Sequence, residues 1–158
     1  MSNFKNSRQS SRLSNFVTAS IEDENCLLVT KCKFNFGYFD YGKKSGQNFK
    51  QWKHSPLIKL LERLQEYGKE PLCYWEKEGN LTIYGDFPKH SEFKRPQQVP
   101  HEALWGRFRL GSTMRLCGFV IPNKFDTIKH SKTGKIFDSN TFYVVFLDNE
   151  HQFYPSKR

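Results

Sequence analysis

The segment that most constrains the fold is TFYVVFLD, residues 141–148, near the C-terminal end of the chain. It is rich in aromatic and β-branched residues, which favour β-strands. Its apolar residues occupy successive positions instead of alternate ones, so both faces of the strand are apolar. Strands of this kind are buried on both sides. The sequence therefore predicts that residues 141–148 form an interior strand of a sheet.

Other segments supply candidate partners for that strand. ALWGRFRL, residues 103–110, and MRLCGFVI, residues 114–121, flank a Gly-Ser pair, which predicts two strands joined as a hairpin. LTIY, residues 81–84, predicts a short strand. In CKFNFGYFDY, residues 32–41, aromatic rings alternate with other residues, which is typical of a half-buried strand.

One helix is clearly predicted between these strands, over SPLIKLLERLQEY, residues 55–67. Ser55 suits the N-cap, Pro56 suits the first helical position and Gly68 suits the end. Its apolar residues repeat at helical spacing and predict one buried stripe: Leu57, Leu60, Leu61, Leu64 and Tyr67. The fold class expected is α+β, with a mostly antiparallel sheet and one or two packed helices.

The chain of 158 residues suits a single domain. Residues 1–20 are polar and basic and are predicted to form a flexible tail, and residues 21–158 form the domain. Residues 122–140 are rich in Gly, Pro, Asn and Lys, which predicts a surface excursion. The N-terminal residues lack the apolar region of a signal peptide, and no apolar run is long enough to cross a membrane.

The formal net charge is +9, so many Lys and Arg side chains must be exposed. Such a surface favours nucleic acid, an anionic membrane or an acidic protein partner. The four cysteines form no C-x-x-C pair, and no histidine stands at zinc-finger spacing from them. We therefore expect free thiols, a cytoplasmic location, no metal and no cofactor.

The two C-terminal strands bring three polar side chains to one edge of the predicted sheet. If residues 114–121 and 141–148 are antiparallel neighbours, the end of the second strand lies beside the start of the first. Arg115 stands at that start, and His151 and Tyr154 follow that end. The topology therefore predicts that these three side chains gather in one place.

Arg107 and Arg109, on the preceding strand, extend this candidate site with two more cations. Guanidinium groups bind phosphate oxygens in a bidentate manner, and a histidine titrates near neutrality. Cleavage of RNA by its own 2′-hydroxyl needs a base, cations at the phosphorus and an acid for the leaving oxygen. Such cleavage requires no metal.

Each of these residues also has an ordinary structural interpretation. Arg115 on a strand edge suits a solvated or ion-paired arginine, His151 suits a surface turn, and the Tyr154 ring suits packing on the sheet. Trp75, in the polar segment CYWEKEGN, suits an exposed stacking position as well as a core position.

The segments WGRFRLGSTMRLCGFVI and FYVVFLDNEHQFY resemble the RelE-like ribonuclease toxins of bacterial toxin–antitoxin systems, the YoeB-type members most. The resemblance covers about the last third of the chain, mainly residues 104–121 and 142–154. It implies that Arg115 steadies the phosphate, that His151 is the general acid and that Tyr154 assists at the C-terminal edge. This chain is longer than typical members, and two residues separate His151 from Tyr154.

The family also uses an acidic residue as the general base, and the candidates for this role in the present chain are Glu70 and Glu102. Three lysines of the excursion add candidate phosphate contacts without sequence preference: Lys129, Lys132 and Lys135.

Two functions follow as expectations, beside a third interpretation in which the chain is an unrelated α+β domain whose charge serves only solubility. The first is a metal-independent endoribonuclease toxin that cleaves mRNA, free or on the ribosome, and is held in check by an antitoxin protein. The second is a non-catalytic binding module, of the kind found in phage or plasmid defence and counter-defence, that occupies nucleic acid or an acidic protein partner.

Overall fold

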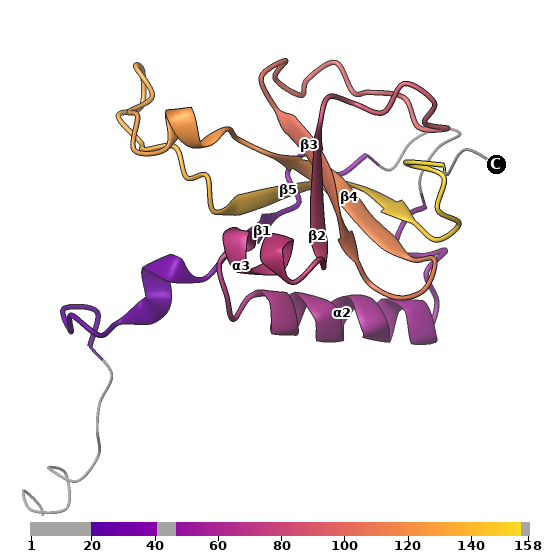
Figure 1. The fold of residues 1–158 in the computed structure, drawn as a ribbon, viewed down its shortest axis with the longest axis horizontal. Helices are drawn as coiled ribbons and strands as arrows, with labels where there is room; N and C mark the ends of the chain where they lie inside the picture. Colours follow the sequence, from indigo (N-terminus) through magenta and orange to yellow (C-terminus); the bar gives the residue numbers. More distant parts are fainter. Residues whose placement is uncertain (1–19, 41–46, 156–158) are drawn as a thin grey trace, which may run out of the picture.

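The computed structural model describes residues 20–40 and 47–155, so the tail expected at residues 1–20 lies outside it except for Ser20. The described residues form a five-stranded sheet in the order β1-β5-β4-β3-β2, whose arrangement Figure 1 shows. The strands are β1 (Lys33–Asn35), β2 (Leu81–Gly85), β3 (Leu104–Arg109), β4 (Arg115–Val120) and β5 (Thr141–Asp148). The helices are α2 (Ser55–Tyr67) and α3 (Leu72–Lys77), with short 3-10 helices η1 (Leu27–Thr30) and η2 (Asn123–Phe125). The expected α+β fold is confirmed.

β5 is an interior strand, as its apolar composition predicted, because it pairs with β4 on one side and β1 on the other. β3 and β4 form the predicted hairpin, with Arg109 opposite Arg115. β1 is parallel to β5, whereas the other pairs are antiparallel. The sheet is therefore mostly antiparallel, with one short parallel strand at its edge.

β4 and β5 approach each other unusually closely at Gly118. A Cβ atom at this position would lie 2.0 Å from the carbonyl oxygen of Tyr143. The register of the two strands shifts at the same place, between Cys117 and Gly118, so that Val145 is the extra residue on β5. Only glycine fits where a neighbouring backbone comes this near.

α2 and α3 cover one face of the sheet, here called the helix-covered face. Its core contains Leu60 and Tyr67 of α2, Trp75 of α3 and Phe108 of β3. The Trp75 ring lies 4.9 Å from the Tyr67 ring and its indole N–H donates to the Tyr67 carbonyl at 2.7 Å. Trp75 is therefore a core residue and offers no exposed stacking surface.

The apolar stripe of α2 is narrower than predicted. Leu60 is buried and Leu57 and Leu64 pack against the core, but Leu61 is 59% exposed. At 100° per residue, Leu61 lies about 80° from the direction shared by Leu60 and Leu64. It therefore sits at the margin of the stripe, beyond the contact with the sheet.

On the opposite face, here called the loop-covered face, the described residues place no helix. Chain segments 86–103 and 149–155 close it instead, through an aromatic core of their own. The residues of this core come from the sheet and from both segments: Phe93, Val99, Ala103, Trp105, Cys117, Phe119, Val145, Phe146 and Phe153. In the described residues, no helix combines the length and apolarity needed to cross a membrane.

The segment predicted as a surface excursion contains η2 and a narrow arm. The arm is closed by an antiparallel bridge between Lys129 and Ile136, and residues 126–136 are all exposed. Figure 1 places this arm beyond the start of β5, whereas the C-terminal segment follows its other end.

Candidate functional site

The C-terminal segment folds back over the loop-covered face because Asp148 holds it there. The Asp148 side chain is buried, and its Oδ1 accepts hydrogen bonds from the backbone N–H groups of Glu150 at 3.1 Å and Gln152 at 3.0 Å. Its Oδ2 accepts from the N–H of Phe153 at 2.9 Å. One carboxylate therefore organises the whole turn that carries His151, whose φ of 60° is in the left-handed region.

Phe153 anchors the far end of this turn. Its ring is fully buried and packs near the rings of Phe87, Phe93 and Trp105, at centroid distances between 5.6 and 6.1 Å. Because His151 and Tyr154 lie on either side of this anchor in sequence, both are held against the sheet near β2 and β3.

One side-chain contact joins the turn to β3. Arg107 Nη1 lies 2.9 Å from His151 Nε2. Since a guanidinium group can only donate, Nε2 accepts this hydrogen bond, and in the neutral imidazole Nδ1 carries the proton. Nδ1 is buried and has no hydrogen-bond partner. The arginine therefore fixes the orientation of the imidazole ring and its tautomer.

Two tyrosines continue this cluster. The rings of Tyr84, on β2, and Tyr154 are stacked, with centroids 4.3 Å apart and planes 5° from parallel. The Arg107 guanidinium carbon lies 5.8 Å from the centroid of the Tyr84 ring. Burial raises the pKa of Tyr84, so its hydroxyl stays protonated at neutral pH. Tyr154 is 46% exposed, and the stack therefore ends at the protein surface.

Arg115 lies in the same part of the sheet but has a different set of partners. Its two Nη atoms donate to the backbone carbonyls of Gly111, Ser112 and Met114 at 2.9 to 3.0 Å, which holds the turn between β3 and β4. Its Nε is buried without a partner. Burial lowers the pKa of Arg115, and the charges of Arg107 and Arg109 lower it further.

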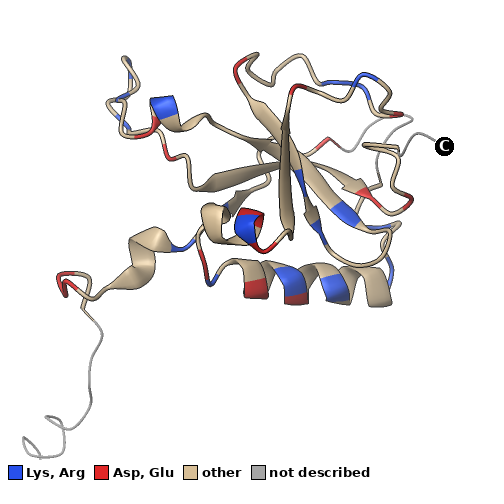
Figure 2. Cartoon of the chain, in the orientation of Figure 1, with Lys and Arg blue, Asp and Glu red and all other residues tan. Residues whose placement is uncertain are grey.

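The arginine cluster, Arg107, Arg109 and Arg115, is poorly neutralised. Arg109 and Arg115 are cross-strand partners, and Figure 2 shows the basic bands of β3 and β4 beside each other. In the described part of the chain, none of the three forms an ion pair with a carboxylate. Asp148 attracts Arg115, but its oxygens are occupied by the turn. The three guanidinium groups therefore carry more positive charge than the single carboxylate of Asp148 neutralises, which favours the binding of an anion.

Unsatisfied polar atoms converge on the same place. Among the described residues, the buried side-chain nitrogen and oxygen atoms without a partner are Tyr84 Oη, Arg115 Nε and His151 Nδ1. Such atoms are costly and rare, and they concentrate where a ligand or a functional role accounts for them.

The two candidates for the general base, Glu70 and Glu102, lie away from the arginine cluster and His151. Glu70 is exposed in the loop between α2 and α3, and its carbonyl accepts from the N–H of Cys32 at 3.2 Å, next to the opposite edge strand β1. Glu102 is exposed and pairs with His101 at 3.2 Å. Neither Glu70 nor Glu102 therefore lies beside His151.

The lysines of the arm are also remote. Lys129, Lys132 and Lys135 are exposed beyond the start of β5, while Asp148 ends that strand. Seven residue steps at about 3.3 Å each separate these ends by roughly 23 Å. The lysines and the arginine cluster therefore form two separate basic regions.

Sequence reasoning missed Tyr84 and the pairing of Arg107 with His151. Tyr84 follows Ile83 on β2 with its side chain on the opposite face, and its relation to Tyr154 depends on how the last segment crosses the sheet. Strand pairing placed His151 beside Arg115, whereas the turn built around Asp148 carries it over β4 to β3.

No family model, curated protein or solved structure matches this chain. Within the described ranges, no group of three or more His, Cys, Asp or Glu side chains is arranged to hold a metal ion.

Proposed function

We propose that this protein binds RNA on the loop-covered face and cleaves it at the Arg107–His151 pair by attack of the RNA 2′-hydroxyl on the adjacent phosphorus. The observation that carries this proposal is the 2.9 Å contact between Arg107 Nη1 and His151 Nε2, within a cluster of arginines that lack carboxylate partners.

Phosphate binding is the first step. A phosphodiester offers two charged oxygens, and a guanidinium group binds such oxygens through paired, charge-assisted hydrogen bonds. Arg107 and the exposed Arg109 supply these donors, and Arg115 adds positive charge from its buried position. Like charges held together in a partly buried site repel one another, and an anion relieves that repulsion.

The chemistry follows from the tautomer of His151. When Arg107 turns its donors to the phosphate, the Nε2 lone pair becomes free to accept the proton of the 2′-hydroxyl. The 2′-oxygen then forms a bond to phosphorus, the bond from phosphorus to the 5′-oxygen breaks, and that oxygen takes a proton from solvent. The products are a 2′,3′-cyclic phosphate and a 5′-hydroxyl. In this proposal His151 therefore acts as base, in place of Glu70, and solvent takes the role of general acid that the resemblance implies for His151.

The stacked tyrosines supply the nucleobase contact. Tyr154 ends the stack at the surface, and a base that lies on its outer face would place the attached phosphate near Arg107. Stacking of a base on an aromatic ring contributes about 1 to 3 kcal/mol and tolerates any sequence.

The cellular part of this proposal is a toxin whose target is mRNA, free or on the ribosome, and whose activity an antitoxin protein restrains. The described cysteines are free, which fits the reducing cytoplasm where mRNA is found.

The second candidate is a non-catalytic module that occupies RNA or an acidic protein partner. One observation favours it: the Nε2 lone pair of His151 is occupied by Arg107, and among the described residues no carboxylate forms a hydrogen bond or ion pair with either side chain. In this case the arginines bind an anion and His151 serves only to position Arg107.

A cleavage assay separates the two candidates. A fluorescent oligoribonucleotide is incubated with purified protein in the presence of EDTA, beside the same sequence as DNA, which lacks the attacking 2′-hydroxyl. Cleavage of RNA only, with a cyclic phosphate end, is expected for the nuclease. Binding of both without cleavage would instead establish the second candidate.

Matched variants assign the site. His151→Ala is compared with His101→Ala, since His101 is exposed in the loop before β3 and, among the described residues, pairs with Glu102. Arg107→Ala is compared with Arg63→Ala, which removes an equal charge from α2, where Arg63 pairs with Glu66. The proposal requires that His151→Ala abolishes cleavage while RNA binding persists, and that both control variants remain active.

A further inference from the structure

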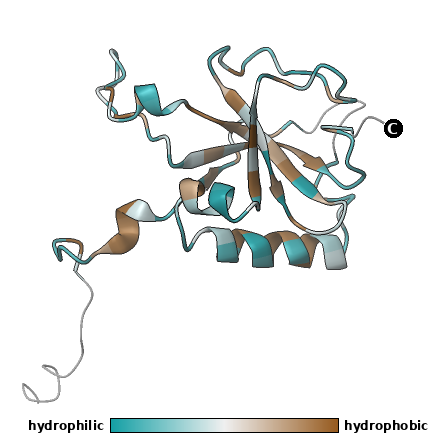
Figure 3. Cartoon of the chain, in the orientation of Figure 1, coloured by the Kyte–Doolittle hydropathy of each residue, from teal (hydrophilic) through white to brown (hydrophobic). Residues whose placement is uncertain are grey.

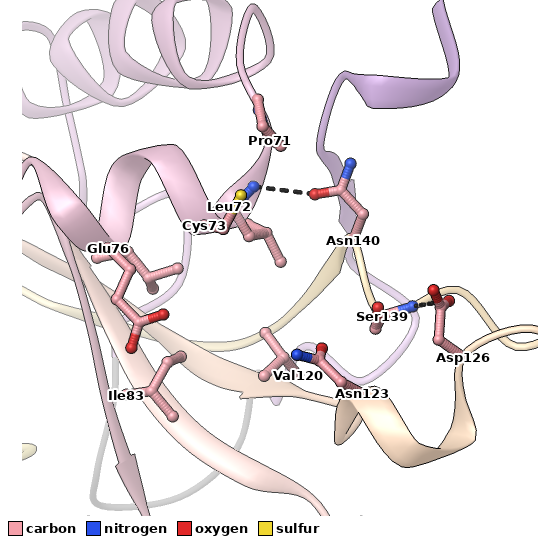
Figure 4. A pocket seen from close by; sticks show the side chains of 11 residues that line it. Pro71, Leu72, Cys73, Glu76, Ile83, Val120, Asn123, Asp126, Ser139 and Asn140 are labelled. Atoms are coloured by element: carbon pink, nitrogen blue, oxygen red, sulfur yellow. Dashed lines mark hydrogen bonds between the residues drawn. The ribbon is translucent and has the colours of Figure 1, made fainter.

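A pocket of about 490 Å³ lies at the side of the helix-covered face, away from the arginine cluster. Figure 4 shows it between α3, β2 and the chain that enters and leaves the arm. Its volume is within the range of sites that hold small ligands. Nothing in the proposed RNA site uses it, because the side chains of Ile83 and Tyr84, neighbours on β2, belong to cores on opposite faces of the sheet.

The inner wall of this pocket is apolar. It is formed by side chains of α3, β2 and β4: Leu72, Leu81, Ile83 and Val120. Leu72 and Leu81 are core residues, so this wall is part of the packed structure and is rigidly held. A ligand that fills the pocket therefore has an apolar body to set against it.

The rim is polar and its charges are all negative. Glu76 and Asp126 contribute carboxylates, and the pocket-lining residues include no Lys, Arg or His. In Figure 4, Glu76 lies on one side of the pocket, with Asn123 and Asp126 on the other. An acidic pocket is unexpected in a chain whose net charge is +9, since most of its surface favours anions.

The Glu76 carboxylate is available for a ligand. Its side chain forms no hydrogen bond or ion pair with another described residue, whereas Asp126 accepts one hydrogen bond, from the N–H of Ser139 at 3.1 Å. Asn140, also on the rim, is committed to structure, because it joins the N–H of Leu72 to the carbonyl of Thr30. Glu76 is therefore the residue expected to contact a charged group.

The positive charge elsewhere on the protein does not cancel the preference of this pocket for a cation. At physiological ionic strength, exposed charges more than about 8 Å apart are largely screened from each other. Among the residues that line the pocket, Glu76 and Asp126 therefore carry the charges that a small ligand meets, whereas Lys77 and Lys124, close to them in sequence, lie outside the lining.

We propose that this pocket binds a small organic cation: an ammonium, amidinium or guanidinium group, held by Glu76, on an apolar body that packs against the inner wall. This site is separate from the arginine cluster in both position and charge preference. It gives the protein a second ligand class, opposite in charge to RNA.

Nuclear magnetic resonance titration of the full chain tests this inference with benzamidine as the probe. Benzamide, its neutral isostere, and benzoate, its anionic counterpart, are titrated in parallel. We expect saturable amide shifts for residues of α3 and β2 with benzamidine, and a dissociation constant on the order of 1 mM for a ligand of this size. The two other probes should bind at least several times more weakly.

A pair of charge-matched variants locates the contact. Glu76→Gln should weaken benzamidine about fivefold, which is the upper range for a solvent-accessible ion pair. Glu78→Gln, which removes the same charge from the C-cap residue of α3, outside the pocket, should leave binding unchanged. Benzamidine should also protect the thiol of Cys73, an exposed residue that lines the pocket, from alkylation.

Three results would overturn the inference: equal affinity for benzamide and benzamidine, equal effects of the two variants, or no saturable shift up to about 20 mM probe. None of them bears on RNA cleavage, which is measured separately.

Discussion

Replacement of Asp148 should release the segment that carries His151. This carboxylate is only 2% exposed and accepts three backbone N–H groups within five residues. It also attracts the buried Arg115, whose guanidinium holds the turn between β3 and β4. One side chain therefore supports both turns that border the arginine cluster.

The size of the effect follows from these bonds. A hydrogen bond to a charged group contributes about 1.5 to 3 kcal/mol, and loss of a buried charged partner typically costs about 3 to 5 kcal/mol in total. Asp148→Ala removes all three bonds, so we expect a loss of about 3 to 5 kcal/mol in the free energy of unfolding. Asp148→Asn keeps the oxygen that serves Glu150 and Gln152 but turns an amide donor towards the N–H of Phe153. For Asp148→Asn we therefore expect about half of the loss in the free energy of unfolding that Asp148→Ala causes.

Urea unfolding followed by tryptophan fluorescence measures this difference, because Trp52 and Trp105 are both buried. With a urea dependence of about 2 kcal/mol/M, a loss of 3 kcal/mol lowers the midpoint by roughly 1.5 M. Asp86→Asn is the control, since Asp86 is exposed and should change stability by less than about 0.5 kcal/mol.

The same variants test the link to function. In conditions where Asp148→Asn remains folded, RNA cleavage should fall at least about tenfold, because a small displacement of a catalytic group has a large effect on rate. A loss of less than about 1 kcal/mol for Asp148→Ala would refute the reasoning that this carboxylate organises the turn.

Three further predictions concern single positions. Gly118→Ala should lower the free energy of unfolding in urea by about 2 to 3 kcal/mol, because the new Cβ would lie 2.0 Å from the Tyr143 carbonyl oxygen. His151→Gly should leave the melting temperature within a few degrees of the wild type, since glycine tolerates the φ of 60°, yet should abolish RNA cleavage. Burial raises the pKa of Cys32 from 9.0 to about 11, so the unfolded chain loses this proton first as the pH rises. Stability should therefore fall between about pH 9 and pH 11, and Cys32→Ala should make the fall in the urea midpoint smaller.

Local patterns were sufficient for most of the sheet. The apolar run of β5, the hairpin of β3 and β4 and the helix α2 each have a signal within a few residues, and each forms at the predicted place. The pattern around residues 32–41 was less informative, because within its described part, residues 32–40, only Lys33–Asn35 pair as a strand. The parallel pairing of β1 with β5 depends on contacts between distant parts of the chain, which no local pattern contains.

α3 was not predicted for a related reason. It has six residues, too few to show a helical period, and its place is set by burial of Leu72 and Trp75 against α2 and the sheet. The polar residues around Trp75 left an exposed position open beside a core position, but they lie on the outer side of this short helix. Tertiary packing overrides weak local preference in elements of this length.

The candidate site depends on the same kind of long-range contact. Antiparallel pairing places Asp148 opposite Arg115, and this pairing follows from the sequence. The next five residues decide which arginine His151 meets, and their course is set by the Asp148 carboxylate and by the burial of Phe153. The sequence does not distinguish a carboxylate that caps a turn from a solvated carboxylate. The contact of His151 with Arg107 therefore has no local sequence signal.

Phe153 explains how a loop-covered face can hold polar groups in fixed positions. A helix would have covered this face with a regular apolar stripe, leaving little room for charge. Here one buried ring fixes the segment, and the residues on either side of it are free to be polar: His151 reaches Arg107, and Tyr154 stacks on Tyr84. The aromatic core of this face therefore acts on the site without contacting RNA, and its apolar residues should be as intolerant of substitution as the arginines themselves.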